Sequence, residues 1–248
     1  MPDEKDNDNT SLERIRSDRG LARPSGFIAR RTRELAQKAR ELKLADDIEV
    51  VFPDKNLEAA IRKQLEQPEG RLTRKDLKRL EKLTVRNKPI EGLTGLEHAV
   101  NLTRLDLCSN QISDISPLAS LIKLTMLNLQ DNKISDITSL ASCTKLTQLD
   151  LNDNQISDVT PLAPLANLDW LELRNNRSSD ISALASLTSL RRLDLWHNEV
   201  SDVSPLTSLP NLGCVCLGAN PLSQDSRTSH IAPLKSRGIF VVLWAGFA

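Results

Sequence analysis

The chain has 248 residues, a length that allows one or two domains. Lys and Arg together number 33, as do Asp and Glu, so no overall field favours nucleic acid or an anionic membrane. Aromatic residues make up only 3% of the chain, so leucine has to supply most of the core. The polar N-terminal stretch holds no apolar signal region, and no segment reaches the roughly 18 apolar residues of a membrane span. We therefore expect a cytoplasmic protein, although unconventional export would fit the same sequence.

The first 47 residues predict no packed domain of their own. Residues 1–24 are rich in Asp, Glu, Asn, Ser and Arg, and we expect them to be disordered. Residues 25–47 predict a charged amphipathic helix, because Ile28, Leu35 and Leu42 fall seven residues apart on one thin apolar stripe. Such a helix could rest on the domain that follows or bind a partner, and the sequence leaves both interpretations open.

Residues 48–82 predict a helical N-terminal cap. Asp54 stands at the start of an amphipathic segment, where it can act as the N-cap of a helix. Thr73 and Asp76 have the spacing of a capping box at a second helix start. A cap is physically required here, because the end of a stack of repeats would otherwise expose its apolar core.

Residues 80–220 repeat with a period of 22 residues, in segments of the form L-x-x-L-x-L-x-x-N. The segments open at Leu102, Leu124, Leu146, Leu168, Leu190 and Leu212, and a degenerate copy from Leu80 precedes them. This pattern and period are typical of a leucine-rich repeat. The expected fold class is therefore α/β: a right-handed solenoid with a parallel β-sheet on its concave face, short 3₁₀ turns on its convex face and a helical N-terminal cap. Residues 221–248 would form the C-terminal cap.

Each repeat position has a predicted role. Strand residues alternate between faces, so Leu105 and Leu107 should point inward while positions 104, 106 and 108 face the concave surface. The repeated Asn should form a buried structural ladder, because its amide can both donate and accept hydrogen bonds. Cys143 takes a position that leucine fills in other repeats, which predicts a buried side chain. On the convex side, the hydroxyl residue before each proline would be an N-cap, at Ser116, Thr160 and Ser204.

The repeats N-x-I-S-D-I-x-P-L-A-x-L resemble the 22-residue class of bacterial internalin-like leucine-rich-repeat proteins. The entry segment FPDKNLEAAIR and the exit segment NPLSQDSRTSHIAPLKSRGI are similar to the caps of such proteins, so the resemblance covers about residues 48–243. It implies binding of other proteins through the concave face. Many members are surface or secreted proteins, and this chain departs from them in lacking a recognisable signal peptide. A eukaryotic phosphatase-regulating class shares the period, but the caps favour the bacterial class.

Repeats four and five differ from the others on the predicted concave face. Alignment of the repeats places Trp170 beside Arg192 and Arg174 beside Trp196. Exposed tryptophan is unusual, and Trp and Arg are enriched at interaction hot spots, although cation–π packing alone would also explain the pairs. We interpret the following residues as a candidate partner-binding surface, the Trp–Arg surface: Trp170, Glu172, Arg174, Arg192, Asp194, Trp196 and His197. The middle outward column of the sheet is an acidic stripe, which fits a solvated face as well as a functional one.

The sequence indicates no chemistry. A phosphate-binding loop, a nucleophile elbow and an HExxH motif are all missing, and Cys214-x-Cys216 lacks the paired C-x-x-C spacing of a zinc site. We expect neither a catalytic residue nor a metal or cofactor. The predicted function is a non-enzymatic interaction module that binds a protein partner of unknown identity, as a monomer, without nucleic acid and without a membrane span. The alternatives are a structural or self-associating scaffold and a regulatory subunit of an enzyme.

Overall fold

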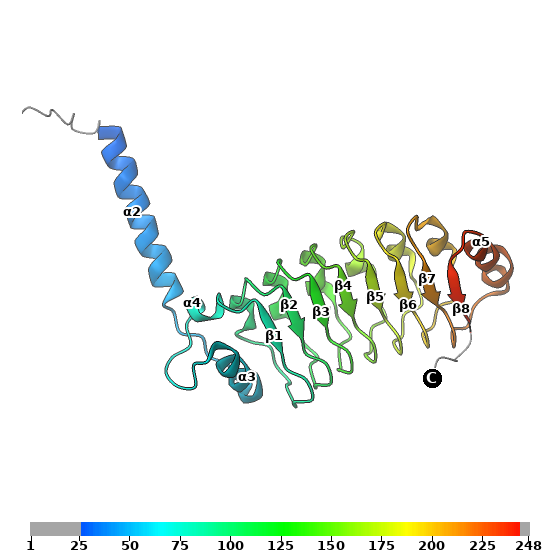
Figure 1. Cartoon of the computed structure of the whole chain (residues 1–248), viewed down its shortest axis with the longest axis horizontal. Helices are drawn as coiled ribbons and strands as arrows, with labels where there is room; N and C mark the ends of the chain where they lie inside the picture. Colours follow the sequence, from blue (N-terminus) through cyan, green and yellow to red (C-terminus); the bar gives the residue numbers. More distant parts are fainter. Residues whose placement is uncertain (1–25, 244–248) are drawn as a thin grey trace, which may run out of the picture. The chain divides into compact units, whose positions relative to one another are not determined.

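The computed structural model describes residues 26–243 and divides the chain into two units, with the boundary between Asp46 and Asp47. The first unit is the helix α2, Gly26–Asp46 (Figure 1). Leu35 and Leu42 are exposed on it, and Arg30 pairs with Glu34 one turn away at 3.0 Å. Three predictions fall at least partly outside the described residues: the disordered segment 1–24, the side chain of Ile28 and the end of the C-terminal cap beyond residue 243.

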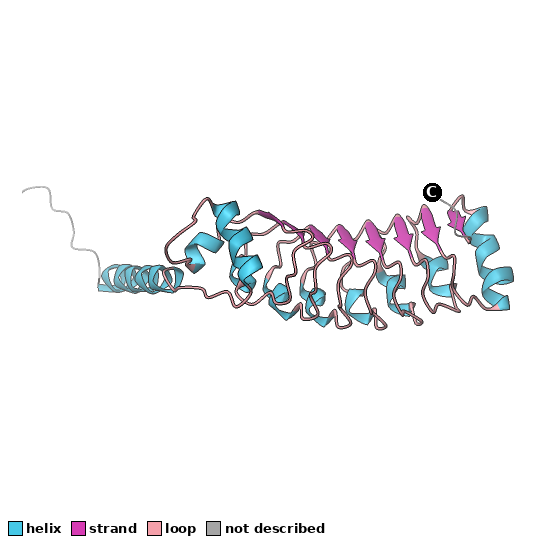
Figure 2. Cartoon of the chain, turned by 90° about the horizontal axis from the view of Figure 1, so that it is seen from below, coloured by secondary structure: helices cyan, strands magenta, loops and turns pink. Residues whose placement is uncertain are grey.

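The second unit is built on one open sheet of eight parallel strands in sequence order. The strands are β1 Lys82–Thr84, β2 Arg104–Asp106, β3 Met126–Asn128, β4 Gln148–Asp150, β5 Trp170–Glu172, β6 Arg192–Asp194, β7 Cys214–Cys216 and β8 Phe240–Val242. From β1 to β7, paired residues are one repeat apart, as in Leu105 opposite Leu127. The strands line one side of the unit and short helical turns the other (Figure 2). The predicted solenoid of the leucine-rich-repeat class is confirmed.

The turns opposite the sheet are the predicted 3₁₀ helices, but their caps differ from the prediction. They are η1 Leu96–His98, η2 Ser116–Ser120, η3 Thr138–Ser142, η4 Thr160–Leu162, η5 Ser182–Ser186 and η6 Ser204–Ser208. The assignment of Ser116, Thr160 and Ser204 as N-caps was wrong, because each is the first helical residue. The backbone N–H of Ser116 instead donates to Asp114 Oδ1 at 2.8 Å, and equivalent aspartates receive the N–H groups of Thr138, Thr160, Ser182 and Ser204.

The chemistry of the carboxylate explains why aspartate caps these turns. A carboxylate is a stronger acceptor than a hydroxyl for the unpaired N–H groups in the first turn of a helix. The hydrogen bonds from Ser182 hold the pKa of Asp180 below its ordinary value, and those from Ser204 do the same for Asp202. The aspartate of the repeated S-D pair therefore caps the turn, and proline in η2, η4 and η6 restrains the backbone.

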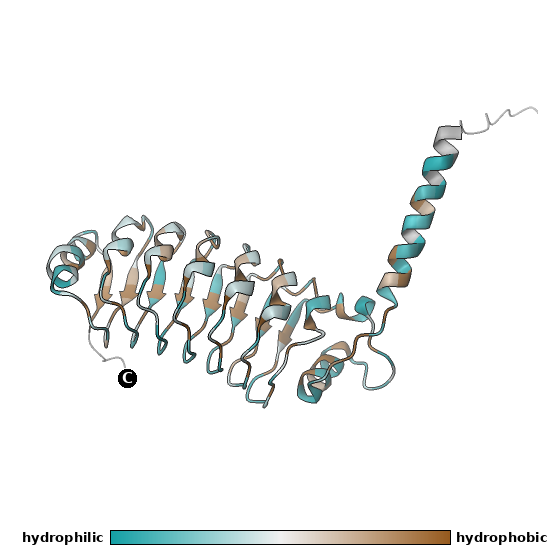
Figure 3. Ribbon diagram, turned by 180° about the vertical axis from the view of Figure 1, so that it is seen from behind, coloured by the Kyte–Doolittle hydropathy of each residue, from teal (hydrophilic) through white to brown (hydrophobic). Residues whose placement is uncertain are grey.

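The core of the solenoid is a stack of inward leucines joined by an asparagine ladder. Leu105 and Leu107 are 2% and 0% exposed, and hydrophobic bands recur along the strands of successive repeats (Figure 3). Asn154 is representative of the ladder: its amide donates to the carbonyls of Leu129 and Leu151 at 3.0 and 3.2 Å, and its Oδ1 accepts the N–H of Ile134 at 3.0 Å. The structural role predicted for these asparagines is confirmed, as is the burial of Cys143.

The N-terminal helices are α3 Lys55–Leu65 and α4 Arg74–Leu77, each started as expected. Asp54 Oδ1 accepts the N–H groups of Asn56 and Leu57, and Thr73 and Asp76 form the capping box. Asp54 Oδ2 also accepts the N–H of Glu91 at 2.8 Å, which ties the cap to the first repeat.

The C-terminal end of the solenoid closes with a π-helical turn, a short α-helix and an edge strand. The π-helical turn η7 spans Ser226–His230 and runs directly into the helix α5, Ile231–Ser236. Gly238, with φ of 82°, ends the helical region, and strand β8 follows. Ile231 and Leu234 are buried, so this segment covers the apolar end of the stack.

Ser178 interrupts an otherwise aliphatic core column. It is fully buried where other repeats place the following side chains: Ile112, Ile134, Ile156 and Val200. Its hydroxyl donates to the carbonyl of Ile156 at 3.2 Å, but that carbonyl already accepts the N–H of Arg177 at 2.9 Å. Removing the hydroxyl therefore leaves no unpaired backbone group.

We expect Ser178→Ile to raise the free energy of unfolding by about 1 kcal/mol, because burial of aliphatic surface outweighs the loss of one shared hydrogen bond. Urea denaturation monitored by circular dichroism measures the change. Ser179, which is exposed next to it, provides the matched control Ser179→Ile, for which no gain is expected. A Ser178→Ile variant less stable than the wild type would show that the site is too small for the added side chain.

Candidate functional site

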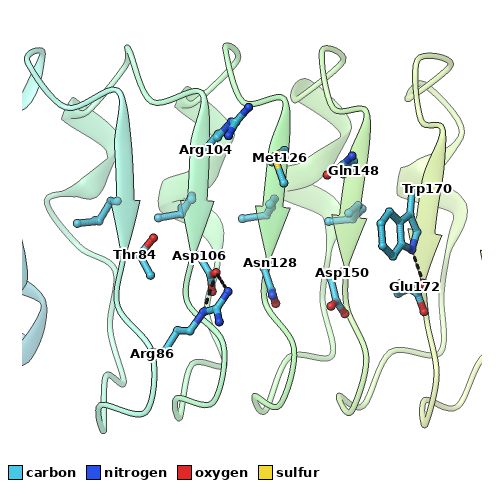
Figure 4. Close-up of a pocket in the computed structure, with 14 residues that line it drawn as sticks. Thr84, Arg86, Arg104, Asp106, Met126, Asn128, Gln148, Asp150, Trp170 and Glu172 are labelled. Carbon is cyan, nitrogen blue, oxygen red and sulfur yellow. Dashed lines mark hydrogen bonds and ion pairs between the residues drawn. The ribbon is translucent and has the colours of Figure 1, made fainter.

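The concave face carries a groove over strands β1 to β5. It has a volume of about 310 Å³. The groove is lined by two rows of outward side chains, seen in Figure 4. One row contains Arg104, Met126, Gln148 and Trp170, and the other contains Thr84, Asp106, Asn128, Asp150 and Glu172. Arg86, from the turn after β1, reaches Asp106 and forms an ion pair with it.

The predicted acidic stripe proves to be largely structural. Oδ1 of Asp106, Asn128, Asp150 and Asp194 accepts the backbone N–H two residues further on, at 2.8 to 3.3 Å. These side chains thus bend back over the end of their strand and are half-buried. Burial raises the pKa of Asp150 and of Asp194 above the ordinary value, because a charged carboxylate is costly to desolvate.

Glu172 departs from this pattern. The N–H two residues on, at Arg174, donates instead to Asn152 Oδ1 at 2.6 Å. The longer side chain of Glu172 is therefore free to accept a hydrogen bond from Trp170 Nε1, and Arg192 Nε lies 3.4 Å from the same oxygen, Oε1. Burial raises the pKa of Glu172 in spite of these partners, since the residue is only 7% exposed. Glu172 thereby fixes the orientation of the Trp170 ring at the end of the groove.

Both predicted Arg–Trp pairs are present. The guanidinium of Arg192 lies 4.8 Å from the Trp170 ring centroid, and that of Arg174 lies 4.3 Å from the Trp196 centroid. Both distances are within the range of cation–π attraction. The two tryptophans differ in exposure: Trp170 is 39% exposed, whereas Trp196 is half-buried.

Trp196 is covered on more than one side. A Cβ added at Gly218 on the next repeat would lie 2.9 Å from its ring, so glycine leaves the room that the indole occupies. His197 is exposed beside Trp196 and bonds through Nδ1 to Asn175 Oδ1 at 2.8 Å. Trp196 therefore contributes to packing, whereas Trp170 has the greater area available for a ligand.

The groove and the Trp–Arg surface overlap only at Trp170 and Glu172. The other predicted residues lie on the adjoining part of the sheet, in or just after β5 and β6. Sequence reasoning missed the following lining residues as a site: Arg86, Arg104, Met126, Gln148 and Asp150. Their outward direction could be read from the repeat, but no sequence signal marked a hollow there. The groove depends on how far neighbouring side chains extend from the sheet.

Strand β7 carries two cysteines, and the environment of Cys216 disfavours its thiolate. Cys214 and Cys216 are free, and burial, followed by the effect of nearby Asp194, raises the pKa of Cys216 to about 12. A thiol with so high a pKa is a poor nucleophile at neutral pH. Within residues 26–243, no group of three or more His, Cys, Asp or Glu side chains is arranged to hold a metal ion. Over the same range, no helix is long and apolar enough to cross a membrane.

The comparisons with known proteins agree with this architecture. The profile described as "Leucine Rich repeats (2 copies)" matches residues 100–142 and 122–164, within the repeat region. The structure is similar to internalin C2 of Listeria monocytogenes, with 31% identity and a TM-score of 0.62 over 81% of this chain and 100% of that one. The chain belongs to the bacterial internalin-like leucine-rich-repeat family. A search of curated proteins gives no significant match.

Two further structures show how far the likeness extends. A second Listeria monocytogenes internalin has 29% identity and a TM-score of 0.63, over 79% of this chain and 65% of that one, so this chain spans just under two thirds of its length. A plant peptide hormone receptor, RGFR1, was solved in complex with RGF2; it has 27% identity and a TM-score of 0.51 over 58% of this chain and 25% of the receptor. Leucine-rich-repeat proteins generally mediate protein–protein interactions, and this family is typically non-enzymatic.

Proposed function

We propose that this protein is a non-enzymatic interaction module that binds a protein partner on the concave face of its sheet. The observation that carries the proposal is the groove over β1 to β5, closed at one end by the exposed Trp170. Tryptophan and arginine are enriched among the residues that supply most of the binding energy of protein interfaces. Glu172 and Arg192 hold the ring in place before a partner arrives, which lowers the entropy lost on binding.

The chemistry of the face also favours binding over catalysis. Its carboxylates are occupied by backbone N–H groups or by arginine, and the pKa of the Cys216 thiol on β7 is raised. The plant receptor, of similar fold, is bound to RGF2, which supports a peptide or protein as the ligand class. A monomeric binding unit is part of the proposal.

The test is affinity capture from cell extract with the wild type and with the variant Trp170→Ala/Trp196→Ala, followed by titration of the captured partner. We expect the double variant to bind the partner about thirtyfold more weakly or worse, because a truncated hot-spot residue costs at least ~2 kcal/mol. Retained affinity in the double variant would refute the assignment of the two tryptophans.

A matched control separates a lost anchor from a lost fold. Ile122 is an apolar residue that is 54% exposed and lies outside every strand. The variant Ile122→Ala should capture the same partner with unchanged affinity. Because Trp196 contributes to packing, all three proteins are also shown by circular dichroism to be folded at the assay temperature, so that the comparison reports on the surface.

A further inference from the structure

The groove is polarised in charge along its length. Its β1–β2 end contains the guanidinium of Arg104, which has no side-chain partner among the described residues, and the Arg86–Asp106 pair, in which the carboxylate is already neutralised. Its β4–β5 end contains the carboxylate of Asp150, which has no arginine partner, and that of Glu172, which lies 3.4 Å from Arg192. A ligand lying along the groove therefore meets unpaired positive charge at one end and carboxylates at the other.

The positive end continues beyond the sheet. A second hollow, of about 580 Å³, lies between α3 and the segment around β1, and it shares Thr84 and Arg86 with the concave groove. Lys63 and Lys88 line it, and within the described chain neither ammonium group has a hydrogen bond or an ion pair. Glu66 is the acidic residue of this lining. Lys63, Lys88 and Arg104 together form a basic end of the concave face, although the chain as a whole has no net charge.

We propose that this basic end, formed by Lys63, Lys88 and Arg104, binds an acidic segment of the protein partner. The inference rests on the proposed function and adds the chemistry and direction of the ligand: acidic residues lie toward α3, and the segment that follows runs across Met126 and Gln148 to Trp170. Unpaired cations at the rim of a hollow provide electrostatic complementarity, which steers a partner and selects its orientation.

The observations favour a protein segment over a nucleic acid. A nucleic acid carries phosphate charge along its whole length, so a strand in the groove would also meet Asp150 and Glu172. Single-strand binding further requires aromatic platforms within the basic region, and the aromatic residue of this groove, Trp170, lies at the carboxylate end. A peptide can change its charge from one residue to the next and so can match both ends.

The test measures binding of a fluorescently labelled oligoglutamate by anisotropy at low salt, with oligolysine and single-stranded DNA of the same length as comparators. The full chain is compared with the variant Lys63→Gln/Lys88→Gln/Arg104→Gln. We expect the wild type to prefer oligoglutamate to both comparators, and the variant to bind it about tenfold more weakly, because the ion pairs are individually modest but additive. Added salt should weaken wild-type binding more than variant binding.

A control variant removes the same charge elsewhere. It changes exposed cations that line neither hollow and have no side-chain partner within the described residues: Lys145→Gln, Arg177→Gln and Lys235→Gln. We expect it to bind oligoglutamate as the wild type does. An equal loss in the two variants, an unchanged affinity in the first, or tighter binding of DNA than of oligoglutamate would each overturn the proposal.

The two proposals fail in different ways. If the basic-end variant keeps its oligoglutamate affinity while Trp170→Ala/Trp196→Ala loses the captured partner, the face binds protein but the assignment of its basic end is wrong. If the basic-end variant loses affinity for oligoglutamate while the tryptophan variant keeps the captured partner, the acidic-segment site stands and the tryptophan anchor is wrong.

Discussion

Replacing Gly95 by alanine should lower the free energy of unfolding by about 3 kcal/mol, from two independent costs. A Cβ at this position would lie 2.6 Å from the ring of Phe52, which is only 1% exposed. The backbone there has φ of 100°, a conformation that residues with a side chain rarely adopt. Because Phe52 precedes the capping helix α3, the change should loosen the cap from the first repeat.

Gly92, three residues earlier in the same connecting segment, provides the matched control. A Cβ added there meets no atom within 4 Å, and its φ is not in the left-handed region. Gly92→Ala should therefore change stability by less than about 0.5 kcal/mol. Urea denaturation of both variants gives the comparison, and hydrogen exchange locates the loss of protection in residues 48–82. Equal stability of the two variants would show that the Phe52–Gly95 contact does not hold the cap.

Replacing Asn154 by alanine should also destabilise the solenoid by about 3 kcal/mol, chiefly because it leaves a buried donor unpaired. The carbonyl of Leu129 keeps a hydrogen bond from Asn132, and that of Leu151 keeps one from Asn176. The N–H of Ile134 loses its acceptor, which is Asn154 Oδ1 at 3.0 Å. The cavity left by the shorter side chain lowers the free energy of unfolding further.

Asn167 is the control of the same residue type. It is exposed, and its amide makes one hydrogen bond, to the carbonyl of Thr144 at 2.9 Å. Asn167→Ala should cost about 1 kcal/mol or less. Both variants are measured by equilibrium unfolding in urea, where a lower slope for Asn154→Ala would indicate that the stack has begun to unfold in parts. A cost for Asn154→Ala no larger than the control's would contradict the ladder as a main source of stability.

Much of the fold was predictable because the repeat places each residue in a recurring environment. The inward direction of Leu105, the burial of Cys143 and the role of the asparagines all followed from a period of one repeat. The caps of the convex turns did not. Asp114 accepts the N–H of Ser116 itself, and whether Ser116 precedes the turn or begins it depends on backbone angles that the sequence pattern does not contain.

The candidate site was predictable only in part. The register of β5 and β6 predicted which tryptophan would lie beside which arginine, and the pairs are present. The concave groove was not predicted, because it is defined by the extent and tilt of several side chains together. The basic end was also missed, since Lys63 and Lys88 come together only where α3 packs beside the first strand, in a hollow next to the groove that Arg104 lines.

The sequence by itself therefore determined the architecture of this protein: a solenoid of stacked strands, its inward and outward residues and its family. A period repeated many times averages out local ambiguity, because every repeat must bury the same face against its neighbours. Only the tertiary structure decided where the concave face is hollow, how Glu172 orients Trp170 and which cations remain unpaired. These features arise where repeats differ from one another, and their effect depends on distances across strands and caps that periodicity does not specify.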